Sequence, residues 1–156
     1  MSKVFIGIDP GLSGAFAVID GDFVAVYDAP SVPVKKGNDY LVADMASLIS
    51  QASSQRSCYA ILEAGIAMPN QSSSSTAKAA RGGGLWEGML VMAGVPYELV
   101  RPAAWKKVMG VTANKAEARV MAQKLFPQIA QQFSRVKDDG RAEAVLIAEF
   151  ARRKAG

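Results

Sequence analysis

Four carboxylates occupy positions from which a fold could gather them into one site. Asp9 and Glu63 each end a near-continuous apolar run, as a residue at the carboxyl end of a buried strand would. Asp139 and Glu143 are four residues apart, so on a helix they share a stripe with side chains that face the core. Burying unpaired carboxylates is costly, and a cage of oxygen ligands favours Mg²⁺. The four acids therefore predict a site for divalent cations.

Two other interpretations of these acids stay open from the residues alone. The turn Pro10-Gly11-Leu12-Ser13-Gly14 after Asp9 could be an ordinary polar hairpin turn, or its glycine amides could hold a phosphate instead of a metal. The two helix acids could belong to a structural network of ion pairs, with Arg141 as the candidate cation. The convergence of all four acids favours the metal site over both.

The elements that must position these acids form a predicted α/β fold around a five-stranded mixed sheet. The predicted strands cover residues 4–9, 15–20, about 23–28, 58–63 and 97–100. The pair Asp20-Gly21 is a hairpin signal, so the first three strands should run antiparallel. A helix leads into the fourth strand, and a right-handed crossover would lay that strand parallel to the first. Asp9 and Glu63 then become neighbours.

Helices are predicted to flank this sheet. Their predicted ranges are 41–52, 85–94, 102–110, 114–126 and 139–153. Asn38 or Asp39 would cap the first of them, after a loop over residues 30–38. Residues 65–84 hold four consecutive serines and three consecutive glycines, which predicts a mobile substrate-binding loop rather than a linker.

The composition limits the chemistry that the chain can perform. A chain of 156 residues, half of them apolar, is expected to form one domain, over residues 1–156. We expect a cytoplasmic protein, because the sequence has neither a membrane-spanning apolar run nor a signal-peptide pattern. The chain has no histidine, and its only cysteine, Cys58, falls in a predicted buried strand. This excludes a Ser-His triad, a Cys-His dyad and ordinary zinc sites.

Charge is distributed unevenly along the chain. The net charge is −3 through Ala77 and +7 from Lys78 onward. A basic half joined to carboxylates at strand ends suggests a polyanionic substrate such as nucleic acid.

Several segments together resemble the RuvC-type Holliday junction resolvases, most closely the chloroplast resolvases and their phage and bacterial relatives. These segments are Ile8 to Ala15, the strand-borne Glu63, Arg101 to Lys107, and Lys137 to Ala144. The resemblance spans nearly the whole chain, and the ordered combination is more specific than any single motif. It implies a ribonuclease H-like fold, a homodimer, dependence on Mg²⁺ with Mn²⁺ as a substitute, and paired nicking of four-way DNA junctions during recombination and repair.

The resemblance also implies roles for individual residues. The catalytic acids of the family map to Asp9, Glu63 and Glu143. The bacterial pattern has its fourth acid where this chain has Gly140, whereas the chloroplast-type spacing matches Asp139. We therefore expect Asp139 to be the fourth ligand, with the adjacent Asp138 able to orient the cage.

The predicted mechanism follows from the cage. Two Mg²⁺ ions would activate a water and stabilise the leaving 3′ oxygen, with Asp9 bridging both ions. Glu143 or Asp139 could accept the proton from that water. Lys115 corresponds best to the basic residue that the family places at the scissile phosphate. Alternatively, Lys115 and the nearby Lys106 and Lys107 are ordinary contacts to backbone phosphates.

Two further surfaces are expected to meet a partner. Lys78 and Arg81, in the predicted mobile loop, should contact DNA near the branch point, and the loop should become ordered there. The helix from Leu85 to Ala93 is expected to supply both core and dimer interface, because Leu85, Trp86, Met89 and Met92 give it a large apolar surface.

Two rival functions stay open. A phosphotransferase of the actin-hexokinase type also uses a Gly-Ile-Asp-x-Gly hairpin to hold phosphate, but that architecture needs two such domains and no second hairpin of this type follows. A non-catalytic junction-binding protein would keep only part of the cage, whereas all four acids are present here.

Overall fold

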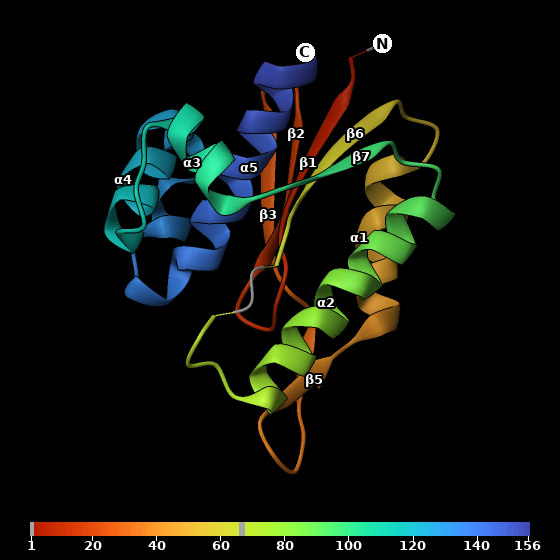
Figure 1. The fold of residues 1–156 in the computed structure, drawn as a ribbon. Coiled ribbons are helices and arrows are strands. Elements are labelled where there is room, and N and C mark those ends of the chain that lie inside the picture. The colour runs from red at the N-terminus through yellow and green to blue at the C-terminus, as the bar shows by residue number, and fades with distance from the viewer. Residues whose placement is uncertain (1, 66–67) are drawn as a thin grey trace.

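The computed structural model describes residues 2–65 and 68–156 and is built on a five-stranded mixed sheet in the order β3-β2-β1-β6-β7 (Figure 1). The strands are β1 (Val4–Asp9), β2 (Ala15–Asp20), β3 (Phe23–Asp28), β6 (Cys58–Glu63) and β7 (Tyr97–Val100). β2 is antiparallel to both β1 and β3, while β6 is parallel to β1 and β7. This confirms the predicted fold class and all five predicted strands.

Helices cover both faces of the sheet (Figure 1). They are α1 (Val42–Ser53), α2 (Ser73–Met92), α3 (Pro102–Met109), α4 (Lys115–Leu125) and α5 (Asp139–Ala155). Side chains alternate between the faces of a strand, so Ile6 and Ile8 of β1 join the core under α1 and α2. Phe5 joins the core beneath the other three helices. The strands are thus buried on both sides, which explains their near-continuous apolar sequences.

The helix that carries Glu143 lies unusually close to the first strand. A Cβ atom at Gly7 of β1 would lie 2.2 Å from the carbonyl oxygen of Ala144 and 2.2 Å from the amide nitrogen of Ala148, both on α5. Only glycine permits this backbone approach. The contact sets the height of α5 above the sheet and brings Glu143 over the end of β1.

Several predictions about the segments between these elements are wrong. Residues 30–38 were expected to form a loop but contain most of a small hairpin, β4 (Ser31–Pro33) paired with β5 (Asn38–Tyr40). Asp39 lies in β5, so neither Asn38 nor Asp39 caps α1, whose N-cap is Leu41 without a side-chain hydrogen bond. Two 3₁₀ segments, Pro127–Phe133 and Val136–Asp138, precede α5 and were not predicted.

The mobile loop expected over residues 65–84 is also wrong over most of its length. α2 begins at Ser73, because the side chain of Ser72 accepts a hydrogen bond from the amide of Ser75 at 3.1 Å and caps the helix. Gly82 packs against the ring of Tyr40, where a Cβ atom would lie 2.3 Å from the phenol oxygen. This glycine therefore serves close packing instead of flexibility. Residues 66 and 67 of the predicted loop lie outside the described residues.

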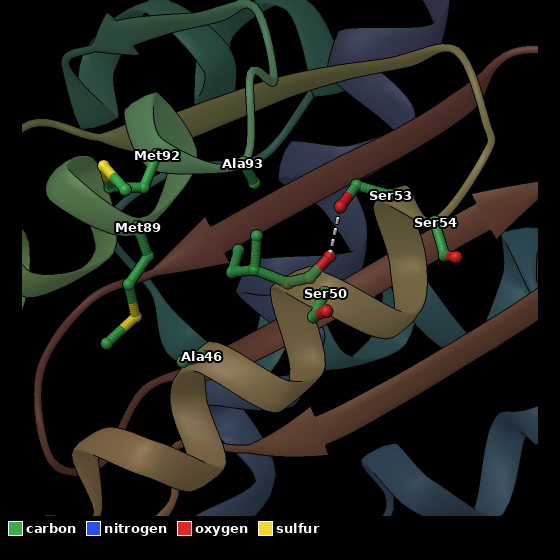
Figure 2. Close-up of a pocket in the computed structure, with 8 residues that line it drawn as sticks. Ala46, Ser50, Ser53, Ser54, Met89, Met92 and Ala93 are labelled. Atoms are coloured by element: carbon green, nitrogen blue, oxygen red, sulfur yellow. Dashed lines mark hydrogen bonds between the residues drawn. The ribbon is translucent and has the colours of Figure 1, made fainter.

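The C-terminal half of α2 contributes to the core as predicted, with Trp86 and Leu90 fully buried. On the outer side of this half of α2, Met92 is 88% exposed. Met92 borders a cleft of about 440 Å³ between α1 and α2 (Figure 2). The lining residues are Ala46, Ile49, Ser50, Ser53, Ser54, Met89, Met92 and Ala93. They include no charged side chain, so this cleft offers no acid, base or metal ligand.

The one cysteine of the sequence lies in the core under α1 and α2. Cys58 is a buried thiol at the start of β6, as predicted, and it donates to the carbonyl oxygen of Ala52 at 3.4 Å. Within residues 2–65 and 68–156, the helices are all too short or too polar to cross a membrane.

Candidate active site

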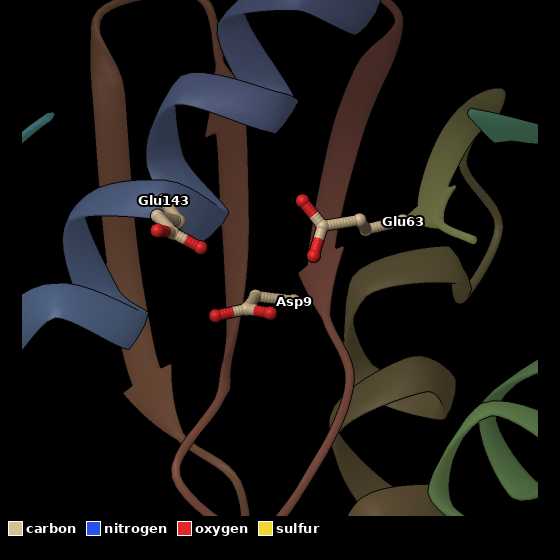
Figure 3. A group of neighbouring side chains, drawn as sticks. All are labelled: Asp9, Glu63 and Glu143. Carbon is tan, nitrogen blue, oxygen red and sulfur yellow. The ribbon is translucent and has the colours of Figure 1, made fainter. Parts of the chain in front are cut away.

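Three of the four predicted acids meet at one end of the sheet. Asp9 and Glu63 lie at the carboxyl ends of the adjacent parallel strands β1 and β6, and Glu143 projects from α5. One carboxylate oxygen from each of the three lies within 4.8 Å of the others. Figure 3 shows the three side chains pointing toward a common centre. The register of the two strands and the Gly7 contact with α5 together produce this convergence.

The cluster carries negative charge that burial leaves poorly solvated. Burial raises the pKa of Asp9 well above its ordinary value, and the negative charges of Glu63 and Glu143 raise it further. Burial is also the largest cause that raises the pKa of Glu63, with the charge of Glu143 adding to it. A divalent cation would relieve both effects. The donor set of carboxylate oxygens alone fits Mg²⁺ or Mn²⁺.

Lys115 lies at the edge of this cluster. Its Nζ donates to Oε1 of Glu143 at 2.5 Å, while its own side chain is 55% exposed. Burial alone lowers the pKa of Lys115, but the hydrogen bond and charge of Glu143 outweigh that and raise it overall. The side chain of Asn114 caps α4 by accepting from the amide of Ala116 at 3.0 Å, which fixes Lys115 in the first helical turn. The structure thus places the ammonium of Lys115 beside Glu143 at the exposed edge of the cluster.

Asp139, the fourth predicted ligand, lies outside the group of three. Its Oδ1 accepts a hydrogen bond from Nε of Arg119 at 3.0 Å. Arg119 is one turn after Lys115 on α4, so two cations four residues apart face two acids four residues apart on α5. Sequence reasoning missed Arg119, although this matched spacing was the signal that could have found it.

Asp138 and Arg141 belong to a separate structural network. Asp138 is 1% exposed and accepts hydrogen bonds from the backbone amide and guanidinium of Arg135. Those hydrogen bonds lower the pKa of Asp138 despite its burial. Arg141 binds Asp28 at 2.7 Å and lies 3.7 Å from Asp138. Arg141 is therefore not the cation that compensates Asp139 and Glu143. Both acids do form ion pairs, as that alternative supposed, but with Arg119 and Lys115.

The structure also gives a reason for the glycine at position 140. A Cβ atom there would lie 2.2 Å from the carbonyl oxygen of Ser13, in the turn after Asp9. The start of α5 packs directly on this turn. A larger residue at position 140, including an acid, would push α5 away from the turn.

Trp105 is a second group at the site that the sequence reasoning did not assign. Its indole nitrogen donates to Oε2 of Glu63 at 2.7 Å, and its ring is fully buried beneath α5. The hydrogen bond opposes the effect of burial on the pKa of Glu63. No local pattern links two residues 42 positions apart, so sequence alone could not show this contact.

The predicted DNA-contacting residues lie on two sides of the acids. Lys106 and Lys107 are on α3 next to Trp105, with Lys106 Nζ 5.6 Å from the centre of that ring. Arg81 of α2 pairs with Asp39 at 3.5 Å, whereas Lys78 Nζ contacts the carbonyl oxygen of Lys36 at 3.4 Å. These α2 contacts join the helix to the β4–β5 hairpin.

A groove of about 400 Å³ lies between the hairpin, α2 and the turn after Asp9. It is lined by Gly11, Leu12, Ser13, Asn38, Tyr40, Ser75, Lys78 and Ala79. The first three of these residues form the turn that directly follows Asp9. A second groove, of about 430 Å³, opens between β6 and α2, with Glu63, Glu87 and small α2 side chains in its wall. The second groove thus reaches Glu63, whereas the wall of the first contains none of the clustered acids.

The stability of the metal-free protein provides a test of the buried charge at Asp9. Because the folded state raises the pKa of Asp9, it binds this proton more tightly than the unfolded chain does. The stabilising contribution of protonated Asp9 is complete below the unfolded pKa of about 4 and is lost as pH rises through the folded pKa. Asparagine at position 9 cannot ionise, so Asp9→Asn does not lose this stability as the pH rises. We expect the melting temperature of Asp9→Asn, measured in EDTA, to exceed the wild-type value by a margin that grows as the pH rises above about 4.

The comparison with the wild type cancels carboxylates away from the cluster, such as Asp28, Asp138 and Glu149, whose lowered pKa values stabilise in the opposite pH direction. Saturating Mg²⁺ should raise the melting temperature of the wild type and shrink the margin, because the ion binds only the folded cluster. Melting temperatures that differ by the same amount at every pH would contradict an unusually basic Asp9.

Comparisons with known proteins support the fold. No protein-family model and no curated protein matches the chain. Thermus thermophilus RuvC in complex with a Holliday junction substrate matches with a TM-score of 0.67 at 19% identity, over 98% of this chain and 96% of that one. A second T. thermophilus RuvC structure matches with a TM-score of 0.55 at 17% identity, over 97% and 96%. The chain therefore has the ribonuclease H-like fold that its sequence predicted.

Proposed function

We propose that residues 1–156 form a single nuclease domain that resolves four-way DNA junctions by paired, metal-dependent hydrolysis of phosphodiester bonds. The main support is the convergence of Asp9, Glu63 and Glu143 at the carboxyl ends of β1 and β6. The likeness to a RuvC structure that contains a junction supports branched DNA as the substrate. The basic charge of the second half of the chain agrees with a polyanionic substrate.

The three clustered acids would hold the metal. In this proposal Asp139 joins them as the fourth ligand when its ion pair with Arg119 opens. Bound divalent cations, two for each site, would supply a water of lowered pKa and would stabilise the negative charge on the leaving 3′ oxygen. Mg²⁺ is the proposed ion, and Mn²⁺ should replace it because both accept oxygen ligands.

Groups of the chain itself would perform the remaining tasks. Lys115, with its ammonium at the cluster and half of its side chain exposed, is positioned to attract and orient the scissile phosphate. Glu143 would then lose its hydrogen bond to Lys115 and could accept a proton from the attacking water. The pairing of β1 with β2 and β6 holds the backbone of Asp9 in place, so this acid is positioned before a metal binds.

We further propose that the β4–β5 hairpin guides a DNA arm toward the acids. Lys36 lies at its exposed tip and Lys78 reaches across to it, and Lys78 also lines the groove that the turn Gly11–Ser13 borders. Lys36→Ala combined with Lys78→Ala should weaken junction binding. Because fewer counterions are released, the slope of log affinity against log salt should become shallower by about 2. A salt series of fluorescence-anisotropy titrations measures both quantities.

A charge-matched control exists at the opposite end of the sheet. Lys3 directly precedes β1 and Lys154 lies near the end of α5, at the end of the sheet where both termini lie (Figure 1). Lys3→Ala combined with Lys154→Ala removes the same charge and should leave the salt slope nearly unchanged. If both double variants lowered affinity equally, the hairpin would have no specific role in binding.

Paired nicking requires two sites related by a two-fold axis, so we propose a homodimer. Of the four side chains expected to form the interface, Trp86 is committed to the core and Leu85 and Met89 are partly buried against it. We therefore propose that the exposed Met92, with its exposed neighbour Val91, contacts the partner. Each protomer would present its own set of acids to one of two opposing strands.

The function is tested by incubating the protein with a synthetic four-way junction and with a linear duplex of the same sequence, in Mg²⁺ or in EDTA. We expect nicks in the junction alone and in Mg²⁺ alone. Binding without cutting in Mg²⁺ would favour a non-catalytic junction-binding protein. ATP hydrolysis without cutting would favour the phosphotransferase.

A further inference from the structure

We propose that Trp105 is a positioning residue whose indole N–H orients the carboxylate of Glu63 for metal binding. The inference rests on the proposed metal site, but not on the identity of the nucleic acid that is cut. Nothing in the sequence pattern of α3 distinguishes Trp105 from an ordinary core residue. The one polar group of its side chain is directed at one of the three clustered acids.

The chain path delivers Trp105 to this position. Glu63, the last residue of β6, pairs with Val100, the last residue of β7, so both strands end side by side. Arg101 continues in an extended conformation and Pro102 starts α3 immediately. Trp105 then falls on the inner side of the first turn, fully buried, with Nε1 2.7 Å from Oε2 of Glu63. The end of one strand thus carries the ligand, and the helix after its neighbour carries the donor.

The consequence for Glu63 is a fixed side-chain orientation. A glutamate has three rotatable bonds, and a ligand that must point toward Asp9 and Glu143 loses that freedom when it binds a metal. One oxygen of Glu63 is held by a charge-assisted hydrogen bond from a rigid, buried donor. The carboxylate is therefore oriented before any cation arrives. Hydrogen-bond partners of metal ligands commonly act in this way.

The second tryptophan provides an internal comparison. Trp86 is also fully buried, stacked on Phe16 with ring centres 5.6 Å apart. In the part of the chain that the structure describes, its indole nitrogen has no hydrogen-bond partner. This core therefore uses a tryptophan for packing alone in one place. Trp105 differs in having its N–H aimed at a site carboxylate.

The test is the affinity of the full chain for Mn²⁺, measured by electron paramagnetic resonance of the free ion in the absence of DNA. Trp105→Phe removes the donor, and we expect Mn²⁺ binding to weaken about 10- to 100-fold. Trp86→Phe is the matched control and should leave Mn²⁺ affinity unchanged, since its ring is buried on the other face of the sheet. In junction cleavage, Trp105→Phe should raise the Mn²⁺ concentration needed for half-maximal rate without changing junction affinity.

A second substitution separates positioning from packing. Incorporation of β-(3-benzothienyl)alanine at position 105 keeps the shape of the indole and replaces only the N–H group by sulfur. This protein should keep the wild-type melting temperature in EDTA and still bind Mn²⁺ about as weakly as Trp105→Phe. Wild-type Mn²⁺ affinity in that protein would overturn the proposal, even if Trp105→Phe were unstable.

The spectroscopic signature of Trp105 gives an independent measurement. In Trp86→Phe, Trp105 is the only tryptophan. The wavelength of its fluorescence emission should shift when Mg²⁺ binds Glu63, because the ion changes the charge beside the indole. In Trp105→Phe the remaining emission of Trp86 should not respond.

The outcomes distinguish this proposal from the proposed function. A wild type that binds Mn²⁺ but cuts no junction would refute the function and leave the role of Trp105 standing. A wild type that binds no Mn²⁺ would overturn both the metal site and the positioning role.

Discussion

Asp9→Asn should abolish nicking of a four-way junction while leaving junction binding intact. The amide keeps the shape of the side chain but removes the negative charge at the centre of the cluster, where Glu63 and Glu143 converge. We expect the single-turnover rate in Mg²⁺ to fall by at least about 10³-fold, comparable with the loss of one preorganised electrostatic group. A gel-shift titration in Ca²⁺ should give a dissociation constant within about twofold of the wild-type value, because phosphate contacts supply most of the affinity.

Asp22→Asn is the matched control. Asp22 is exposed in the turn between β2 and β3, and the same substitution there should change neither cutting nor binding. Cutting by Asp9→Asn at more than a tenth of the wild-type rate would remove Asp9 from the catalytic cluster. Loss of binding together with cutting would show that the substitution damages the fold or the DNA surface instead.

Gly7→Ala should destabilise the protein more than any single change on its surface. The added methyl group would lie 2.2 Å from backbone atoms of both Ala144 and Ala148, and backbone cannot move aside as a flexible side chain can. We expect the free energy of unfolding to fall by about 3 kcal/mol, at the upper end of the usual cost of overpacking. Urea denaturation followed by circular dichroism measures it.

The control for Gly7→Ala is Gly88→Ala. Gly88 lies within α2, and a Cβ atom there would meet no atom within 4 Å. Alanine should therefore stabilise that helix by up to about 1 kcal/mol. The fraction of Gly7→Ala protein that still folds should also cut junctions more slowly, because α5 must move away from β1 and carry Glu143 with it. Wild-type stability of Gly7→Ala would show that α5 does not need the close approach.

The sequence predicted the sheet and most of the acid cluster because both depend on local patterns. An apolar run that ends in one acid specifies a buried strand and also places its last residue at the sheet edge, as Asp9 and Glu63 show. The four-residue spacing of Asp139 and Glu143 placed them correctly on one helix. It could not show that they differ in depth, so that only Glu143 reaches the other acids.

The features that escaped prediction depend on contacts between distant residues. From the sequence alone Gly82 suggests flexibility, whereas in the structure Tyr40 packs against it, and the N-terminal part of α2 was missed for that reason. The sequence alone suggests that Trp105 is a core residue, whereas the structure shows that Glu63 accepts its N–H. The role of Arg119 likewise becomes visible only through its hydrogen bond to Asp139. In each case the local composition was compatible with two structures, and tertiary packing chose between them.

The most direct test of a metal-dependent, paired junction nuclease is the cleavage of a supercoiled plasmid that extrudes a cruciform. Two nicks made within one complex convert the plasmid to a linear molecule, whereas independent nicks produce a relaxed circle first. We predict linear product in Mg²⁺ without accumulation of nicked circle, no cleavage in EDTA, and no cleavage by Asp9→Asn under either condition. An intact plasmid in Mg²⁺, or cleavage that persists in EDTA, would contradict the proposed function.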